Sequence, residues 1–155
     1  LTLLNLTIQI LMPKKILKLF LDIGLYVLIV VGIVWGLPKG LAYYLDTQYP
    51  MATITSGSMW PALKIGDLVF IKHVAKTDLK VGDIVVWTNK SGFTIHRVAK
   101  LDKKTFVTKG DANFIEDSPV DYKDLVGRAV LGGEKPLRIP YVGLIAKAVN
   151  NLKGQ

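Results

Sequence analysis

The feature that most constrains this chain is the apolar stretch Phe20–Leu37, which lies between a group of lysines and Pro38. From Ile23 to Leu37 it carries no charged residue. A membrane-spanning helix needs about 20 mostly apolar residues, and the leucines just before Phe20 extend the run to that length. We therefore predict a transmembrane helix at residues 16–38.

Two other interpretations of this stretch are open: a buried core helix, or a signal peptide that is later removed. No small-residue cleavage site follows the apolar run cleanly, and Gly40-Leu41-Ala42 comes nearest to one. Half of the 155 residues are hydrophobic, and the excess lies in the first third of the chain. This distribution favours a membrane segment joined to a globular domain.

Charges beside the apolar stretch predict its orientation. Only Lys39 follows it closely, whereas three lysines precede it: Lys14, Lys15 and Lys18. Because positive charges favour the cytosolic side, residues 1–15 should be cytosolic, although residues 1–11 themselves are uninformative. Residues 39–155 should form an extracytosolic domain. The prediction is a single-pass protein of the cell membrane or the endoplasmic-reticulum membrane.

Beyond Pro50 the sequence changes to short runs rich in β-branched and aromatic residues, separated by Gly, Asp, Lys or Asn. Such runs predict strands. The expected strands are residues 51–55, 68–74, 84–88, 93–101, 105–109 and 126–131. The apolar segment 141–149 is too short to span a membrane and predicts a short closing helix packed on the domain or an interfacial helix. The sequence thus predicts a mainly antiparallel β-domain.

Net charge and composition limit the possible partners and cofactors. A charge of +8 is compatible with nucleic-acid binding, but the lysines are scattered and are not grouped with aromatic residues. A basic domain beside anionic lipid explains the charge equally well, so we expect membrane lipid and no nucleic acid as a partner. Since the chain has no cysteine and two histidines, we expect no metal or cofactor.

An internal repeat places a Gly-Asp pair before two of the predicted strands. Leu63–Val69 is echoed by Leu79–Val85, with Gly66-Asp67 and Gly82-Asp83 at matching positions. Glycine accepts a positive φ, and aspartate can bond to nearby backbone. We interpret both aspartates as structural.

The stretch Ser56-Gly57-Ser58-Met59-Trp60-Pro61 follows the first predicted strand. A serine in a tight turn can direct its hydroxyl and its backbone N–H at one small volume. Acyl transfer needs a nucleophile and an oxyanion donor arranged in that way. An ordinary turn between two strands is the simpler interpretation.

A serine nucleophile needs a base, and the candidates are His96, His73 and a desolvated lysine. Strand alternation places His96 and Val98 on one face, which points at least partly inward. An imidazole with a pKa of about 6.5 suits general-base work. His73 lies beside lysines near a strand end, and we interpret it as a surface residue.

The loop at residues 108–117 carries three carboxylates and an asparagine. A carboxylate can fix the tautomer of a catalytic histidine. A calcium loop or a plain turn is the alternative, although the ligand spacing does not fit an EF-hand.

Four motifs occur in a fixed order: Ser56-Gly57-Ser58-Met59-x-Pro61, Gly82-Asp83-Ile84-Val85, Ile95-His96-Arg97-Val98 and Gly110-Asp111-x-Asn113-x-x-x-Asp117. Between about Trp35 and Leu131 they resemble the conserved boxes of type I signal peptidases. His96 stands where the bacterial branch has a lysine, so the sequence resembles the archaeal and endoplasmic-reticulum (Ser-His) branch. The resemblance implies a membrane-anchored catalytic domain built as a partly open, antiparallel, β-barrel-like structure.

The same resemblance implies a role for each site residue. Ser58 would be the nucleophile and His96 the base. Asp117 would orient His96, with Asp111 as a second important carboxylate, although which of the two contacts His96 stays open. Ser56 would assist the backbone N–H of Ser58 in holding the oxyanion.

The implied activity is that of a membrane-bound serine endopeptidase that removes signal peptides from secreted and membrane preproteins after small residues. Met51, Ile54 and Thr55 would line the pockets that bind the substrate. Met59 and Trp60 would rest on lipid, and the secretion translocon would be a further partner. The alternatives are a self-cleaving, repressor-type serine peptidase and a membrane-tethered, non-catalytic β-module that binds a partner protein.

Overall fold

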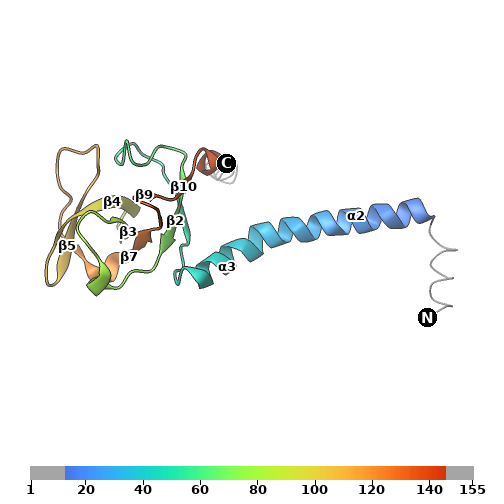
Figure 1. Cartoon of the computed structure of the whole chain (residues 1–155), viewed down its shortest axis with the longest axis horizontal. Coiled ribbons are helices and arrows are strands. Elements are labelled where there is room, and N and C mark those ends of the chain that lie inside the picture. The colour runs from blue at the N-terminus through green and yellow to red at the C-terminus, as the bar shows by residue number, and fades with distance from the viewer. Residues whose placement is uncertain (1–12, 146–155) are drawn as a thin grey trace. The chain divides into compact units, whose positions relative to one another are not determined.

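The computed structural model describes residues 13–145. The chain divides into two compact units, Leu1–Gly40 and Leu41–Gln155. Figure 1 shows that helices make up the described part of the first unit and that strands dominate the second.

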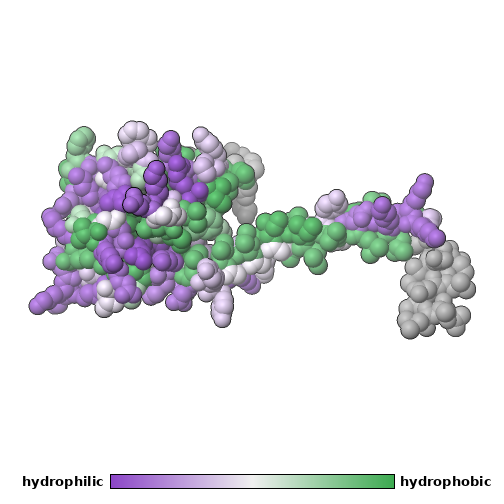
Figure 2. Space-filling view, in the orientation of Figure 1, coloured by the Kyte–Doolittle hydropathy of each residue, from purple (hydrophilic) through white to green (hydrophobic). Residues whose placement is uncertain are grey.

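A single long helix, Lys14–Tyr44, begins the described part of the chain, and it is long and apolar enough to cross a membrane. It consists of α2 (Lys14–Val31), a π-helical turn (Gly32–Gly36) and α3 (Leu37–Tyr44). None of its residues is buried, and Figure 2 shows hydrophobic side chains along much of its length. Exposed apolar residues on all sides suit contact with lipid better than a place in a protein core.

The helix continues beyond residue 38, where we expected the spanning segment to end. Pro38 has no backbone N–H, and its ring opposes a regular helical turn before it. The π-helical turn Gly32–Gly36 directly precedes this position, and such wider turns accommodate a break in the regular hydrogen-bond pattern. Residues 16–38 as the part within the membrane stay a prediction.

In its described residues, 41–145, the second unit contains ten strands, which largely follow the predicted ones. Their bounds are β1 (Met51–Thr53), β2 (Leu68–Lys72), β3 (Ile84–Asn89), β4 (Gly92–Leu101), β5 (Thr105–Lys109), β6 (Val120–Asp121), β7 (Leu125–Ala129), β8 (Leu131–Gly132), β9 (Lys135–Pro136) and β10 (Arg138–Ile139). All six predicted strands are present, and the last of them is divided into β7 and β8. The three strands that were not predicted have only two residues each, which is too few to give a periodic pattern.

The main sheet has the order β1-β2-β7-β3-β4-β5-β6, with β10 also paired to β2. Every pairing is antiparallel, which confirms the predicted fold class. Within residues 13–145, no strand pairing joins β1 to β6. The sheet therefore does not close, and the expected barrel-like form describes it only loosely.

Two apolar clusters form the core and place the serine turn. One contains Met59 and Leu63 with residues of β2, β3 and β7, and the other contains Phe106 of β5 with Val98 of β4. Met59 is 1% exposed, so the chain directly after Ser58 is fixed to the core.

The two Gly-Asp turns have the structural role that the repeat predicted. Asp67 and Asp83 each accept a hydrogen bond from the backbone N–H three residues earlier, at 2.8 and 3.0 Å. Each also binds an arginine from a later strand, Arg138 and Arg128 respectively. The glycine before each aspartate has a φ of 88° or 95°, a conformation that only glycine adopts readily.

The predicted closing helix at 141–149 begins within the described residues, where positions 142–145 are helical. The rest of that prediction, and the predicted segment at residues 1–11, lie outside them.

Candidate active site

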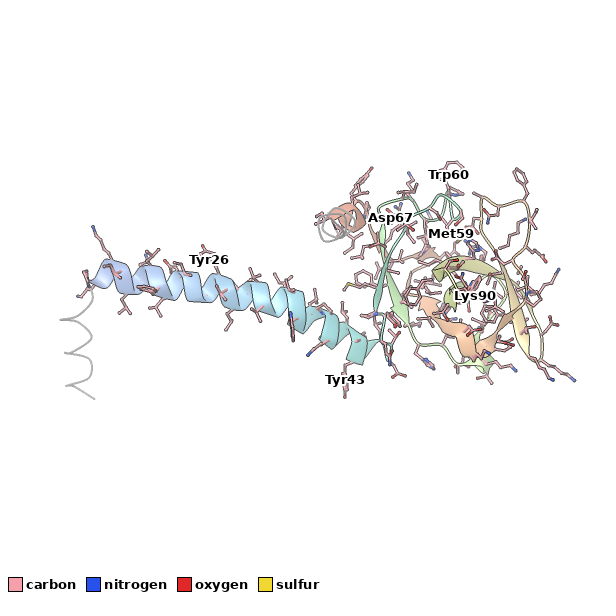
Figure 3. The ribbon with its side chains drawn as sticks, turned by 180° about the vertical axis from the view of Figure 1, so that it is seen from behind. Tyr26, Tyr43, Met59, Trp60, Asp67 and Lys90 are labelled. Carbon is pink, nitrogen blue, oxygen red and sulfur yellow. The ribbon has the colours of Figure 1, made fainter. Side chains whose placement is uncertain are left out.

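Ser58 lies in a turn that is followed by one buried and one exposed side chain. Met59 anchors the turn to the core, whereas Trp60 points away from the domain and is 60% exposed (Figure 3). The expectation that Met59 would contact lipid is therefore wrong, because its side chain fills the core. Trp60 remains free for such a contact.

The loop after β5 holds the carbonyl group of Ser58 in place. The backbone N–H of Ala112 donates a hydrogen bond to Ser58 O at 2.8 Å. Gly110 packs closely against the same turn, and a Cβ atom at Gly110 would lie only 2.7 Å from Ser58 O. The Gly110-Asp111-x-Asn113 motif thus positions the serine turn through its backbone.

The hydroxyl and the amide of Ser58 face a different environment from its carbonyl. Ser58 Oγ lies 3.1 Å from Ser56 Oγ, within hydrogen-bonding distance. In the described part of the chain, the Ser58 backbone N–H donates to no acceptor. A free amide and a neighbouring hydroxyl are suitable donors for an oxyanion.

His96 lies in β4 opposite Val85 of β3 and is 8% exposed. Its Nδ1 atom lies 2.6 Å from Oδ2 of Asp117, in the loop after β5. An ionised carboxylate only accepts hydrogen bonds, so Nδ1 bears the hydrogen. Nε2 is then free to accept a proton.

Asp111, the second predicted carboxylate, has a different partner. Arg97 donates two hydrogen bonds to Asp111, from Nε at 2.8 Å and from Nη2 at 2.7 Å. This hydrogen-bonded contact raises the pKa of Arg97 above its ordinary value. Arg97 also donates to the carbonyl of Gly82 at 2.8 Å, so the pair ties β4 to both neighbouring turns.

Alternation along β4 explains why the two carboxylates separate. His96 and Arg97 are consecutive residues of one strand, so their side chains leave opposite faces of the sheet. The question that the sequence left open thus has a geometric answer: Asp117 contacts His96, and Asp111 contacts Arg97.

A cleft of about 520 Å³ connects the predicted site residues. Ser58, Ser56 and His96 line it together with the three predicted substrate-binding residues, Met51, Ile54 and Thr55. Among the hydrogen bonds of the described residues, none joins Ser58 to His96. Catalytic hydrogen bonds are often long without substrate and tighten when substrate binds.

The other candidate base, His73, is exposed and does not line this cleft. Its prediction as a surface residue is confirmed. Within residues 13–145, no group of three or more His, Asp or Glu side chains is arranged to hold a metal ion.

Two side chains near Asp117 were missed by the sequence reasoning. Thr108 donates a hydrogen bond to Asp117 Oδ2 at 2.6 Å, and Trp87 Nε1 donates to Thr108 Oγ1 at 3.1 Å. Thr108 was visible only as a polar residue in a β-rich run. Trp87 appeared as an ordinary strand residue 21 positions before it.

Comparison with known proteins agrees with this geometry. Residues 37–129 match the family model described as Peptidase S24-like. The chain is 32% identical over 128 residues to the signal peptidase complex catalytic subunit SEC11C of Homo sapiens, covering 73% of this chain and 64% of that protein. It is 35% identical over 118 residues to the signal peptidase complex catalytic subunit SEC11 of Pyricularia oryzae, covering 69% of this chain and 67% of that protein.

The mammalian relatives are thus matched over 64% of their length, and the fungal one over slightly more. The family match covers more than half of this chain and includes the serine turn, β4 and the acidic loop. The chain therefore belongs to the S24-like peptidase family, in the group that includes the catalytic subunits of signal peptidase complexes.

Proposed function

We propose that this protein is a membrane-bound serine endopeptidase that removes signal peptides from secreted and membrane preproteins after small residues. The observation that carries the proposal is the shared cleft of Ser58 and His96, in which His96 is hydrogen-bonded to Asp117. A nucleophile, a base and a carboxylate behind the base are the three parts that serine acyl transfer requires. The similarity to signal peptidase catalytic subunits supports the substrate class.

In the proposed reaction, Ser58 Oγ attacks the scissile carbonyl carbon while His96 Nε2 takes the hydroxyl proton. The carbonyl oxygen becomes an oxyanion, which accepts hydrogen bonds from the backbone N–H of Ser58 and the hydroxyl of Ser56. Asp117 stabilises the protonated imidazole. The C–N bond then breaks, and His96 gives its proton to the leaving amine. Water, deprotonated by His96, releases the acyl group from Ser58.

The edge of the sheet offers a place for an extended substrate. Strand β1 is terminal in the sheet and pairs with β2. Since Ile54 exchanges backbone hydrogen bonds with the β2 side, alternation directs the backbone groups of Met51, Thr53 and Thr55 the other way. A peptide that adds to this free edge would be held by its main chain, with its side chains in the cleft.

The long helix would hold the enzyme at the membrane where its substrates emerge. The lysines before the apolar stretch support a cytosolic N-terminus, which leaves the β-domain on the extracytosolic side. Exposed Trp60, next to the serine turn, would rest on the lipid surface. The secretion translocon, which delivers the preproteins, would be a further partner.

Cleavage of a purified preprotein by this protein in liposomes tests the proposal. Ser58→Ala and His96→Ala should each lower the cleavage rate by roughly a thousandfold or more, while circular dichroism shows a folded domain. Substitution of the small residues before the cut site by large ones should also prevent cleavage. Full activity of the His96→Ala variant would contradict the proposed mechanism.

A further inference from the structure

Beyond the three proposed catalytic residues, a partly buried hydrogen-bond chain leads away from Asp117. It passes from Asp117 Oδ2 to Thr108 Oγ1 at 2.6 Å and on to Trp87 Nε1 at 3.1 Å. Thr108 lies in β5 and is fully buried, at 0% exposed. Trp87 lies in β3, partly buried, so the chain connects the loop of Asp117 to two strands of the rigid sheet.

The direction of every hydrogen bond in this chain follows from the donor groups. An indole Nε1–H can only donate, so Thr108 Oγ1 accepts from Trp87. The single hydroxyl hydrogen of Thr108 is then directed to Asp117 Oδ2. The same oxygen accepts from His96 Nδ1 at 2.6 Å. Asp117 Oδ2 thus accepts two short hydrogen bonds, one from His96 and one from Thr108, and these two donors fix its position.

We propose that Thr108 and Trp87 are positioning residues that fix Asp117 and, through it, the tautomer and orientation of His96. This inference rests on the proposed function, because it assigns both residues to the same reaction. Asp117 lies in a loop, where a carboxylate would otherwise have rotational freedom. A second contact between the same two residues joins their backbones, from Asp117 N–H to Thr108 O at 2.8 Å, and holds Asp117 beside Thr108. Trp87 sets the direction of the Thr108 hydroxyl.

We call the hydrogen bonds that lead from Trp87 through Thr108 and Asp117 to His96 the relay. Thr108→Val tests the relay because valine keeps the β-branched shape and removes the hydroxyl. Loss of a hydrogen bond to a charged group should lower kcat for preprotein cleavage by roughly ten- to a hundredfold. KM should stay within about twofold, since Thr108 does not line the substrate cleft. Thr108→Ser retains the hydroxyl and should restore most of the activity. Trp87→Phe should have a smaller effect in the same direction.

Thr88→Val is the matched control. Thr88 is a partly buried threonine of β3, whose hydroxyl donates to the carbonyl of Asp124 and takes no part in the relay. Its variant should cleave at the wild-type rate. Wild-type kcat in the Thr108→Val variant, or an equal loss in Thr88→Val, would overturn the relay.

A double variant separates positioning from general packing. If Thr108 acts through Asp117, adding Thr108→Val to Asp117→Asn should cause little further loss of kcat. If the two losses multiply, Thr108 acts by another route and the relay is wrong.

A spectroscopic measurement tests the relay without relying on the proposed cleavage activity. Proton NMR of the folded protein should show the Nδ1 hydrogen of His96 as a low-field signal. Thr108→Val should shift or remove that signal, and Thr88→Val should leave it in place. An unchanged signal in Thr108→Val would overturn the relay. If the signal responds to the two substitutions in this way but the wild-type protein cleaves no preprotein, the role of Thr108 stands and the proposed function is contradicted.

Discussion

His96 Nδ1 and Asp117 Oδ2 lie 2.6 Å apart, although the two residues belong to different segments of the chain. The β4–β5 pairing brings them together, because Arg97 lies opposite Lys109 and the acidic loop starts directly after it. This pairing also brings Asp111 to Arg97 on the other face of β4. Strand β4 therefore binds both carboxylates, Asp117 through His96 on one face and Asp111 through Arg97 on the other.

Replacement of each carboxylate by its amide should reveal this division. Asp117→Asn should lower kcat for preprotein cleavage by roughly a thousandfold or more, because an amide favours the wrong tautomer of His96. Asp111→Asn should act mainly on stability. It breaks a partly exposed, bidentate pair with Arg97, which should lower the free energy of unfolding by about 1 kcal/mol. Cleavage rates and urea denaturation of both variants measure the contrast.

Equal losses of kcat in the two variants, at equal stability, would contradict the assignment of Asp117 to His96. Wild-type cleavage by Asp117→Asn would do so more strongly.

Gly110 should be intolerant of any side chain. A Cβ atom at this position would lie 2.7 Å from Ser58 O and 2.8 Å from Asn113 Nδ2, so Gly110→Ala must displace the serine turn or its own loop. A displacement of about 1 Å near a reacting group can cost roughly a hundredfold in rate. Cleavage assays should show such a loss.

Gly132→Ala is the control for this prediction, because its Cβ would meet the nearest side-chain atom, of Leu137, at 3.5 Å, an ordinary contact. If Gly110→Ala and Gly132→Ala cleave equally well, the close packing against Ser58 does not matter for activity.

Met59 and Trp60 should respond in opposite ways to truncation. Met59→Ala removes a core side chain that is 1% exposed and should lower the free energy of unfolding by about 2–5 kcal/mol. Trp60→Ala should leave stability almost unchanged and weaken adsorption of the β-domain, expressed without the helix, to lipid vesicles. Denaturation and vesicle co-sedimentation test the pair. A Trp60 variant as destabilised as Met59→Ala would contradict the exposed position of the indole.

The cleavage rate should fall on acidification. Only a neutral imidazole can take the proton of Ser58, so protonation of His96 removes the base. Activity is therefore present at higher pH and is lost as His96 gains its proton. Measurement of kcat/KM from neutral to acid pH, with stability followed in parallel, tests this. A rate that stays flat far into acid would show that another group is the base.

The sequence was sufficient to predict the main strands and the three residues that carry the proposed reaction, Ser58, His96 and Asp117. Strands β2 to β5 have several β-branched or aromatic residues each, which gave a clear local signal. The choice between Asp111 and Asp117 was not reached, because the alternation of His96 and Arg97 separates their faces but does not say which carboxylate lies on which face. The extent of the long helix was missed because Pro38 normally ends a helix, and the π-helical turn before it was not foreseen.

The contacts of Thr108 and Trp87 lay beyond sequence reasoning for a different reason. Their hydrogen bond joins β3 to β5 across β4, and its existence depends on the register of two strand pairings. Register is a property of the assembled sheet, whereas the local pattern gives only the presence of each strand.

Covalent labelling of Ser58 tests the central claim most directly. A serine-directed acylating reagent should modify Ser58 in the membrane-embedded full chain, and mass spectrometry of the digested protein should locate the adduct there. The His96→Ala variant should label more slowly by roughly a hundredfold or more, at unchanged folding. Labelling of Ser58 at the same rate without His96, or modification of other serines in its place, would contradict the Ser58–His96 mechanism.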